Sequence, residues 1–398
     1  MRALLPFTKY HGLGNDFVLI DARELVFDPA LAPLLANWKT AVEKLAPRIC
    51  DRHYGIGADG VILAMPLYGA SETEPFETQS KARGKKTTGE FPSRHTSVAG
   101  LEATGAAFLA TEYRKAVTAL TADYPQVDSC ELSWVYTNSD GSNAVMCGNG
   151  LRCLALWARL RGGVEEREFQ IATAKGAIAV QMTNSNSICV DVGEPVLEAD
   201  QIPAVVKDGS KSGFIEFDLP VAGSNLAVIA VGMGNPHGVI LDQNVWKGWS
   251  GAVQSIGTQN ERLREPDQLE GNSRQELVAI AQAVQSNPAF PQGVNVEFVQ
   301  VLSRDQVRCY VYERGCGFTL ACASGAAAVV VAGVLAGRLE RTSKVQLPGG
   351  TLEIAFDETD NRVRITGPAS EIFSGVFKLE HLNLLELCSD SKAEANCK

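Results

Sequence analysis

Two short cysteine motifs occur, one in each half of the sequence. Met-Cys-Gly-Asn-Gly at 146–150 contains Cys147, and Ala-Cys-Ala-Ser-Gly at 321–325 contains Cys322. Each motif follows a predicted strand and a loop, and each begins an apolar helix. One such unit per half predicts two similar domains that face each other across a cleft. The alternative is that two unrelated helix starts both contain a cysteine.

The position of both thiols predicts acid–base chemistry. A thiol at a helix N-terminus lies near unpaired backbone N–H groups and the positive end of the helix dipole, so we expect both cysteines to favour the thiolate. The glycines Gly148, Gly150 and Gly325 let a ligand approach the backbone, whose N–H groups could hold a carboxylate. A hydrolase would need one nucleophile with a histidine base. Two thiols without such a base fit racemisation, in which one removes a proton from carbon and the other delivers a proton to the opposite face.

Polar side chains in or beside glycine-rich loops form a second group of candidates. They suit a small substrate that carries carboxylate and amine groups. For each asparagine the alternative is turn formation, and for the arginine it is a surface ion pair. The candidates are Asn15, Asn138, Asn235, His237, Asn295, Glu313 and Arg314.

The elements that must position these residues alternate between strands and helices. Strands are predicted at 17–21, 60–64, 132–138, 169–172, 177–182, 187–192, 226–232, 294–302 and 306–313. Helices are predicted at 30–45, 150–160, 274–285 and 324–339, with a further amphipathic helix within 101–124. Residues 315–337 carry no charge, but glycine and alanine favour a buried core helix over a membrane span.

Composition narrows the class of protein. With 398 residues, 45% hydrophobic and 21% charged, the chain is globular and long enough for two or three domains. A net charge of −10 argues against a general nucleic-acid binder.

Ten cysteines without a zinc-type spacing or a secretory signal indicate a reducing compartment, and we expect a cytoplasmic protein. We take Cys50, Cys130, Cys189, Cys309, Cys388 and Cys397 as structural or incidental, and Cys153 and Cys316 as core thiols near the two helices.

Several of these motifs, in this order, resemble diaminopimelate epimerase. The resembling stretches are 9–17, 50–52, 55–60, 138–153, 233–237 and 312–326. The resemblance implies an α/β (α+β) fold of two pseudo-symmetric domains, each a curved sheet wrapped around a central helix. It places the first domain at 1–191 plus about 367–381 and the second at 192–366, with polar insertions at about 66–130 and 245–274 and a frayed tail at 382–398.

The resemblance also implies an activity and a set of roles. The enzyme would be an isomerase of lysine biosynthesis that interconverts LL- and meso-diaminopimelate without pyridoxal phosphate, another cofactor or a metal. Cys147 and Cys322 would be the catalytic base and acid, and His237 and Glu313 would tune their pKa values. The substrate would contact Asn15, Asn138, Gly148, Asn149, Asn235, Asn295, Glu313, Arg314, Ala323 and Ser324. Neither a nucleic-acid nor a membrane partner is implied; a homodimer is the candidate assembly, and a plant or algal source would place the enzyme in plastids.

Two positions depart from the family pattern. Ala323 stands where the family usually has glycine, which restricts the backbone and crowds the cleft, and Gly60 stands where many members have glutamine. The alternatives are a proline or hydroxyproline racemase of the same fold, disfavoured by Asn149 where those enzymes have histidine, and an inactive binding relative, disfavoured because both cysteines are retained. A thiol-redox protein is disfavoured because no resolving cysteine completes a CxxC motif.

Overall fold

A computed structural model describes most of the chain. The described residues are 4–67, 103–144, 146–205, 215–221, 224–241, 254–255, 261–262 and 273–379. Much of both predicted insertions, and the whole predicted tail at 382–398, lie outside these residues.

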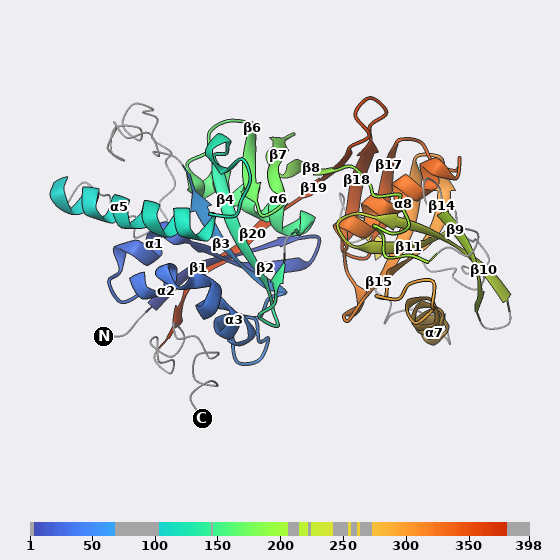
Figure 1. The fold of residues 1–398 in the computed structure, drawn as a ribbon, viewed down its shortest axis with the longest axis horizontal. Coiled ribbons are helices and arrows are strands. Elements are labelled where there is room, and N and C mark those ends of the chain that lie inside the picture. The colour runs from blue at the N-terminus through green and yellow to red at the C-terminus, as the bar shows by residue number, and fades with distance from the viewer. Residues whose placement is uncertain are drawn as a thin grey trace.

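The described residues form a mixed α/β fold in two parts (Figure 1). The helical segments are α1 (Ala22–Phe27), α2 (Ala32–Ala36), α3 (Trp38–Ile49), α5 (Ala103–Leu120), the 3₁₀ turn η2 (Val127–Ser129), α6 (Gly148–Trp157), the π-helical turn η3 (Ala158–Gly162), α7 (Ser273–Gln285) and α8 (Ala323–Leu335). The strands of the first part are β1 (Leu4–Gly12), β2 (Asn15–Asp21), β3 (Gly60–Pro66), β4 (Leu132–Asn138), β5 (Asn143–Ala144), β6 (Glu168–Thr173), β7 (Gly176–Met182), β8 (Ser187–Gly193) and β20 (Ser370–Lys378). Those of the second are β9 (Ile215–Val221), β10 (Ser224–Gly232), β11 (Pro236–Ile240), β14 (Asn295–Ser303), β15 (Gln306–Glu313), β16 (Gly317–Thr319), β17 (Thr342–Leu347), β18 (Gly350–Phe356) and β19 (Val363–Pro368), with a separate pair β12 (Gln254–Ser255) and β13 (Glu261–Arg262).

Strand pairing repeats between the two parts. From β8 the sheet continues through β7, β6, β4, β3, β2 and β1 to β20, and from β19 it continues through β18, β17, β15, β14, β11 and β10 to β9. Both paths have the same sequence of antiparallel and parallel pairings, and β8 pairs with β19 where they join. The short strands β5 and β16 occupy equivalent places beside β4 and β15, directly before α6 and α8. The repeat predicted from the two cysteine motifs is therefore present in the topology, whereas the exact domain boundaries stay a prediction.

Each sheet encloses one central helix and carries other helices on its opposite face. In β2, Phe17 and Leu19 pack with α6, whereas Val18 and Ile20 pack with α1 and α3, because successive side chains of a strand point to opposite faces. The helix α8 lies in the corresponding place in the second part, with α7 on the outer face of that sheet (Figure 1). Residues 315–337 thus form β16 and the buried α8, and no helix in the described residues is long and apolar enough to cross a membrane.

Two helix predictions need correction. The predicted helix 30–45 is two helices, because the backbone leaves the helical region at Asn37, whose side-chain amide donates to the Pro33 carbonyl at 3.0 Å. The predicted helix 324–339 ends at Leu335, since Gly337 adopts φ +67° and the Gly333 carbonyl then accepts from Arg338 and Leu339.

The insertion between β3 and β4 has no counterpart between β14 and β15. Its described helix α5 packs through Tyr113, Val117 and Leu120 into the outer cluster that contains α1 and α3. The Tyr113 hydroxyl donates to the Pro66 carbonyl at 2.9 Å. The helix α5 of the insertion therefore covers the outer face of the first sheet and not the side that holds α6 (Figure 1).

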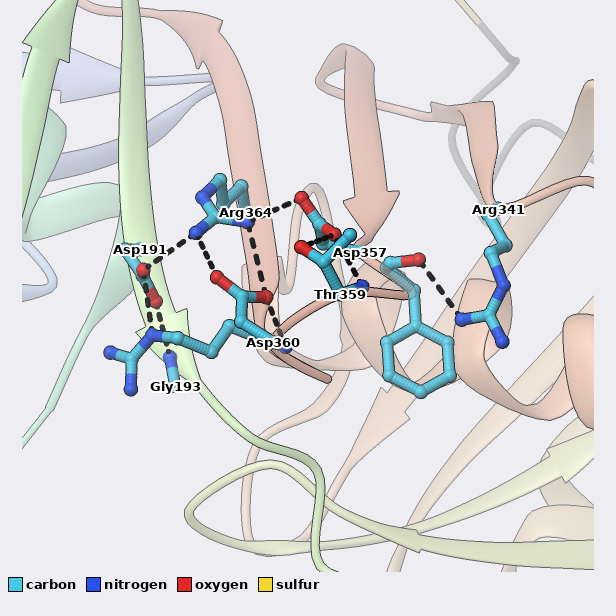
Figure 2. A network of polar contacts seen from close by, with 9 residues as sticks. Asp191, Gly193, Arg341, Asp357, Thr359, Asp360 and Arg364 are labelled. Atoms are coloured by element: carbon cyan, nitrogen blue, oxygen red, sulfur yellow. Dashed lines mark hydrogen bonds and ion pairs between the residues drawn. The ribbon is translucent and has the colours of Figure 1, made fainter.

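Polar and apolar contacts join the two parts. Asp191 of β8 accepts from Arg362 Nε, directly before β19, at 2.8 Å and lies 3.5 Å from Nη2 of Arg364 on β19. Figure 2 shows Arg364 between Asp191 and the loop carboxylates of Asp357 and Asp360. The β1–β2 turn adds an apolar contact, because Leu13 is buried in the cluster around α8.

Gly349→Ala tests the contact of the β1–β2 turn. A Cβ at position 349 would lie 1.9 Å from the Leu13 carbonyl oxygen and 3.0 Å from the Leu320 carbonyl oxygen, and both are backbone atoms. We expect a loss of about 1–3 kcal/mol of unfolding free energy, measured by urea denaturation. Glu353→Ala, at an exposed position of β18, is the control and should change stability by less than about 0.5 kcal/mol. Equal stability of both variants would contradict this account of the turn.

Candidate active site

Cys147 and Cys322 occupy the same structural position in the two parts. Each is the N-cap residue of its helix, with an extended backbone, and each sulfur accepts a hydrogen bond from the backbone N–H three residues later. The donors are Gly150 for Cys147 and Gly325 for Cys322, both at 3.4 Å. The placement of both thiols at helix N-termini, predicted from the motifs, is confirmed by these caps.

The N-termini of α6 and α8 meet. A Cβ at Gly148 would lie 3.0 Å from the Cβ of Ala323, so the first residues of the two helices are in contact. The Asn149 side-chain amide donates to the Ala321 carbonyl at 3.2 Å, directly before Cys322. Gly148, Asn149, Ala323 and Ser324 therefore share one region with both thiols. The methyl group of Ala323 occupies this contact, in agreement with the crowding expected from its departure from the family pattern.

Burial overrides the expected acidity of the thiols. It raises the pKa of Cys147 to about 11, although the Gly150 N–H and the Arg152 cation act in the opposite direction. Burial together with the negative Glu313 raises the pKa of Cys322 well above 9.0. The expectation that the helix N-terminus makes thiolate the favoured form is therefore wrong for the free protein, because desolvation of the charged sulfur outweighs the helix N–H groups.

Glu313 lies beside the second thiol. Its Oε1 accepts from the Thr319 hydroxyl at 2.6 Å, and its negative charge raises the pKa of the Cys322 thiol. Burial raises the pKa of Glu313, and the Thr319 hydrogen bond opposes the rise. The charge of Glu313 acts on Cys147 as well as on Cys322, so this carboxyl of β15 connects the two thiols electrostatically.

His237 is held between two side chains in the interior. Its Nδ1 lies 2.6 Å from Glu297 Oε1 and its Nε2 lies 2.8 Å from Asn235 Oδ1, and the ring has no exposed surface. Glu297 also raises the pKa of Cys322, and a Cβ at Gly325 would lie 2.8 Å from Glu297 Oε1. The pKa tuning proposed for His237 therefore involves Glu297, which the motifs did not indicate.

The remaining candidates lie at the ends of neighbouring strands. In the first part, Asn15 begins β2 with a buried, unpaired Oδ1, and Asn138 ends β4 opposite Gly60 and donates to Ser142 Oγ at 2.9 Å. In the second part, Asn295 begins β14 opposite His237, and its Oδ1 accepts from the Arg314 N–H at 2.8 Å. The Arg314 guanidinium donates to the Gln292 carbonyl at 2.6 Å and is exposed at the end of β15. Their roles toward a substrate stay predictions.

The presence of glycine at position 60, one of the two departures from the family pattern, is explained by the neighbouring residues. A Cβ there would lie 2.6 Å from the Tyr136 ring and 2.7 Å from the Thr137 carbonyl oxygen. No larger residue fits without moving β4, so the ring of Tyr136 takes the space into which a side chain at position 60 would extend.

Two further observations concern cysteines and metals. Cys153 is fully buried, as predicted, but Cys316 is exposed, so its interpretation as a core thiol is wrong: it lies in the turn between β15 and β16. Among the described residues, no group of three or more His, Cys, Asp and Glu side chains is arranged to hold a metal ion.

The motifs missed Glu297 and Arg152, although the sequence contains a signal for each. Glu297 is a charged residue within the predicted strand 294–302, on the same face as Val299, which packs against α8. Arg152 is the one charged residue of α6 and has no exposed surface. A lone charge on the buried face of an apolar element indicates a polar partner inside the protein.

Comparison with solved structures defines the class of fold. A hydroxyproline epimerase from Agrobacterium vitis matches with a TM-score of 0.50 over 96% of this chain and 94% of that chain, at 12% sequence identity. At this identity the likeness concerns the fold alone, and it agrees with the predicted architecture of two similar α/β parts.

Sequence comparison defines the family. The family model described as diaminopimelate epimerase matches residues 85–198 and 229–372. The diaminopimelate epimerase of Synechocystis sp. is 36% identical over 371 residues, which cover 93% of this chain and 98% of the relative. The chloroplastic diaminopimelate epimerase of Oryza sativa subsp. japonica is 34% identical, with 93% of this chain and 79% of the relative covered. The chain belongs to the diaminopimelate epimerase family, and it is therefore an isomerase with a small-molecule substrate.

The raised thiol pKa values predict how stability depends on pH. The folded protein keeps the Cys322 proton to a higher pH than the unfolded chain, which releases it near 9.0. The stability that comes from keeping this proton is fully present below pH 9. It falls as the pH rises above 9, by about 1.4 kcal/mol per pH unit for each such thiol. In urea denaturation between pH 8 and 10.5, Cys322→Ala should lose stability less steeply than the parent protein by about that slope. Ser343→Ala, which removes a buried hydroxyl, is the control, and its unfolding free energy should depend on pH as steeply as that of the parent protein. The raised pKa of Cys322 would be contradicted if Cys322→Ala also showed the pH dependence of the parent.

Proposed function

We propose that the protein interconverts LL- and meso-diaminopimelate by proton transfer at one α-carbon, with Cys147 and Cys322 as the two acid–base groups. The observation that carries this proposal is the contact between the N-termini of α6 and α8, each capped by one of the thiols. Membership of the family supplies the substrate, since the relatives bear this name at 36% and 34% identity.

The proposed step conserves atoms and charge. With the substrate α-carbon between the sulfurs, the Cys147 thiolate takes the α-proton of one stereoisomer and becomes a thiol. The Cys322 thiol gives its proton to the opposite face of the carbanion and becomes a thiolate. The configuration at carbon is then inverted, and the reverse reaction begins with Cys322 as the base.

Burial of the thiols supports this role. A thiolate of high pKa is a stronger base than one of low pKa, and the α-proton of an amino acid is a weak acid. The backbone N–H groups at the starts of α6 and α8 could hold the α-carboxylate and the negative charge that develops on it. Gly148, Asn149, Ala323 and Ser324 are the residues we assign to this carboxylate.

The polar strand ends would hold the rest of the substrate. We assign Asn15, Asn138, Asn235, Asn295 and Arg314 to the distal amino acid group, and Glu313 to the reacting amine. The buried, unpaired Oδ1 of Asn15 supports its assignment, because an unsatisfied buried acceptor gains most from a donor supplied by a ligand. His237, with Glu297, would act on the pKa of Cys322 through the charge of the pair.

Location and assembly are part of the proposal. The expected cytoplasmic location, with a plastid as the alternative for a plant or algal source, stays a prediction, and so does a homodimer. Fluorescent tagging in the source cells and analytical ultracentrifugation are the direct measurements.

Deuterium incorporation tests the proposed reaction. In D₂O the protein should convert LL-diaminopimelate to the meso isomer and place one deuterium at the inverted α-carbon, since the incoming hydron comes from a thiol that exchanges with solvent. Mass spectrometry and chiral chromatography give both results. L-Proline and trans-4-hydroxy-L-proline serve as control substrates and should not react. The proposal would be overturned if the folded protein neither exchanged the α-hydrogen of diaminopimelate nor epimerised it.

Single substitutions test the cysteine pair. Cys147→Ala and Cys322→Ala should each lower kcat by about 10²–10⁴-fold, because each removes one of the two proton-transfer groups. Cys316→Ala is the matched control: it removes an exposed thiol close in sequence to Glu313 and should leave kcat unchanged. Loss of activity confined to one of the two alanine variants would rule out a two-base reaction.

A further inference from the structure

Arg152 is a buried cation without a carboxylate partner among the described residues. Its side chain has no exposed surface, and the oxygens that accept its hydrogen bonds are neutral: Asn149 Oδ1 at 2.6 Å, Gly148 O at 3.3 Å and Pro368 O at 3.4 Å. Within the described ranges, the ion pairs do not include Arg152. A buried charge that is paired only with neutral oxygens is costly, so such a residue is expected to have a counter-charge in the working enzyme.

Glycines on both sides make room for this guanidinium. A Cβ at Gly12, the last residue of β1, would lie 3.2 Å from Arg152 Nη2, and a Cβ at Gly367 of β19 would lie 3.4 Å from Arg152 Nε. The cation is therefore enclosed between a strand of the first part and a strand of the second, and its position in α6 is fixed by both.

The titratable groups around Arg152 include Cys147. Arg152 interacts electrostatically with Cys147 and Cys153 of its own segment. Cys147 in turn faces Arg152, Cys153, Tyr136 of β4 and Glu313 of β15, and Arg152 is the cation among them. Glu313 and Glu297 both raise the pKa of Cys322, so the Arg152 cation distinguishes the surroundings of Cys147 from those of Cys322.

Asn149 extends the contact to the second thiol. A guanidinium only donates hydrogen bonds and a backbone carbonyl only accepts them, so Arg152 must face Asn149 Oδ1 and the amide Nδ2 must face Ala321 O. Arg152 thereby fixes the orientation of the amide that joins the start of α6 to the residue before Cys322.

We propose that Arg152 is a positioning residue whose buried guanidinium is the counter-charge of the Cys147 thiolate and which orients Asn149 against the Cys322 loop. The proposal rests on the proposed function for its use in catalysis, whereas the hydrogen bonds of Arg152 to Gly148 and Asn149 are present in the free protein. Burial lowers the pKa of Arg152 to about 10, so the side chain keeps its charge at neutral pH. The cation lowers the pKa of Cys147 in opposition to burial.

The test compares Arg152→Gln, which removes the charge, with Arg152→Lys, which keeps it. The pH dependence of Cys147 alkylation by iodoacetamide is measured by peptide mass spectrometry, which separates Cys147 from the exposed Cys316. We expect the alkylation profile of Arg152→Gln to move upward by about 1–3 pH units and that of Arg152→Lys to stay close to the parent. Arg159→Gln is the matched control, because this arginine lies at the far end of the same helical segment, where it donates to the Val164 carbonyl at 2.9 Å, and its profile should not move.

Epimerisation supplies the second measurement. In Arg152→Gln the apparent pKa of the acidic limb of the kcat/KM profile should increase by the same number of pH units as the alkylation profile. In Arg152→Lys this apparent pKa should return to that of the parent protein. Unchanged Cys147 alkylation in Arg152→Gln, or equal shifts in the Gln and Lys variants, would overturn the proposal. If Arg152→Gln does not fold, Arg152→Lys alone still tests the proposal. Because lysine keeps the positive charge, an upward shift of its Cys147 alkylation profile by about 1–3 pH units would overturn the proposal as well. Because alkylation needs no substrate, its result is independent of whether diaminopimelate is the substrate.

Discussion

The contact between the first turns of α6 and α8 constrains every other part of the site. Helix N-termini carry unpaired N–H groups, and placing two of them against each other away from water is unfavourable unless each finds an acceptor. The sulfurs of Cys147 and Cys322 accept from the backbone N–H groups of Gly150 and Gly325, and the side-chain amide of Asn149 donates to the Ala321 carbonyl across the contact. The N–H groups that remain are those a substrate carboxylate would satisfy. The repeated sheets serve this contact, because each encloses one helix and directs its N-terminus toward the other.

The electrostatics of the site follow from burial more than from the helix dipoles. Desolvation raises the pKa of both thiols, and the local charges then distinguish them. Arg152 lies beside Cys147, whereas Glu313 and Glu297 lie beside Cys322. A pair of thiols that is nearly symmetric in backbone position is thus asymmetric in charge, which favours the proton on Cys322 and the negative charge on Cys147.

Local sequence predicted much of this structure. The strands 132–138 and 306–313 and the helix at 274–285 were predicted closely, because each is an apolar or amphipathic run with clear ends. Strands β17 to β20 were not, since exposed residues such as Lys344 and Glu353 dilute their apolar pattern. The cysteines were found from their helix starts, but Glu297 and Arg152 were not, because their importance depends on which faces become buried. For the same reason the direction of the thiol pKa shifts could not be read from the motifs.

The last described strand completes the first sheet. In the folded protein β20 pairs with β1, although more than 350 residues separate them in the sequence. The strand before β20, β19, pairs with β18 on one side and with β8 on the other. During synthesis on the ribosome, which proceeds from the N-terminus, the first half therefore emerges with β1 lacking one neighbour until residues 370–378 follow. Neither half of the sheet is complete before nearly all of the chain is made. A polypeptide truncated before β20 would therefore expose the edge of β1 to pairing with other chains.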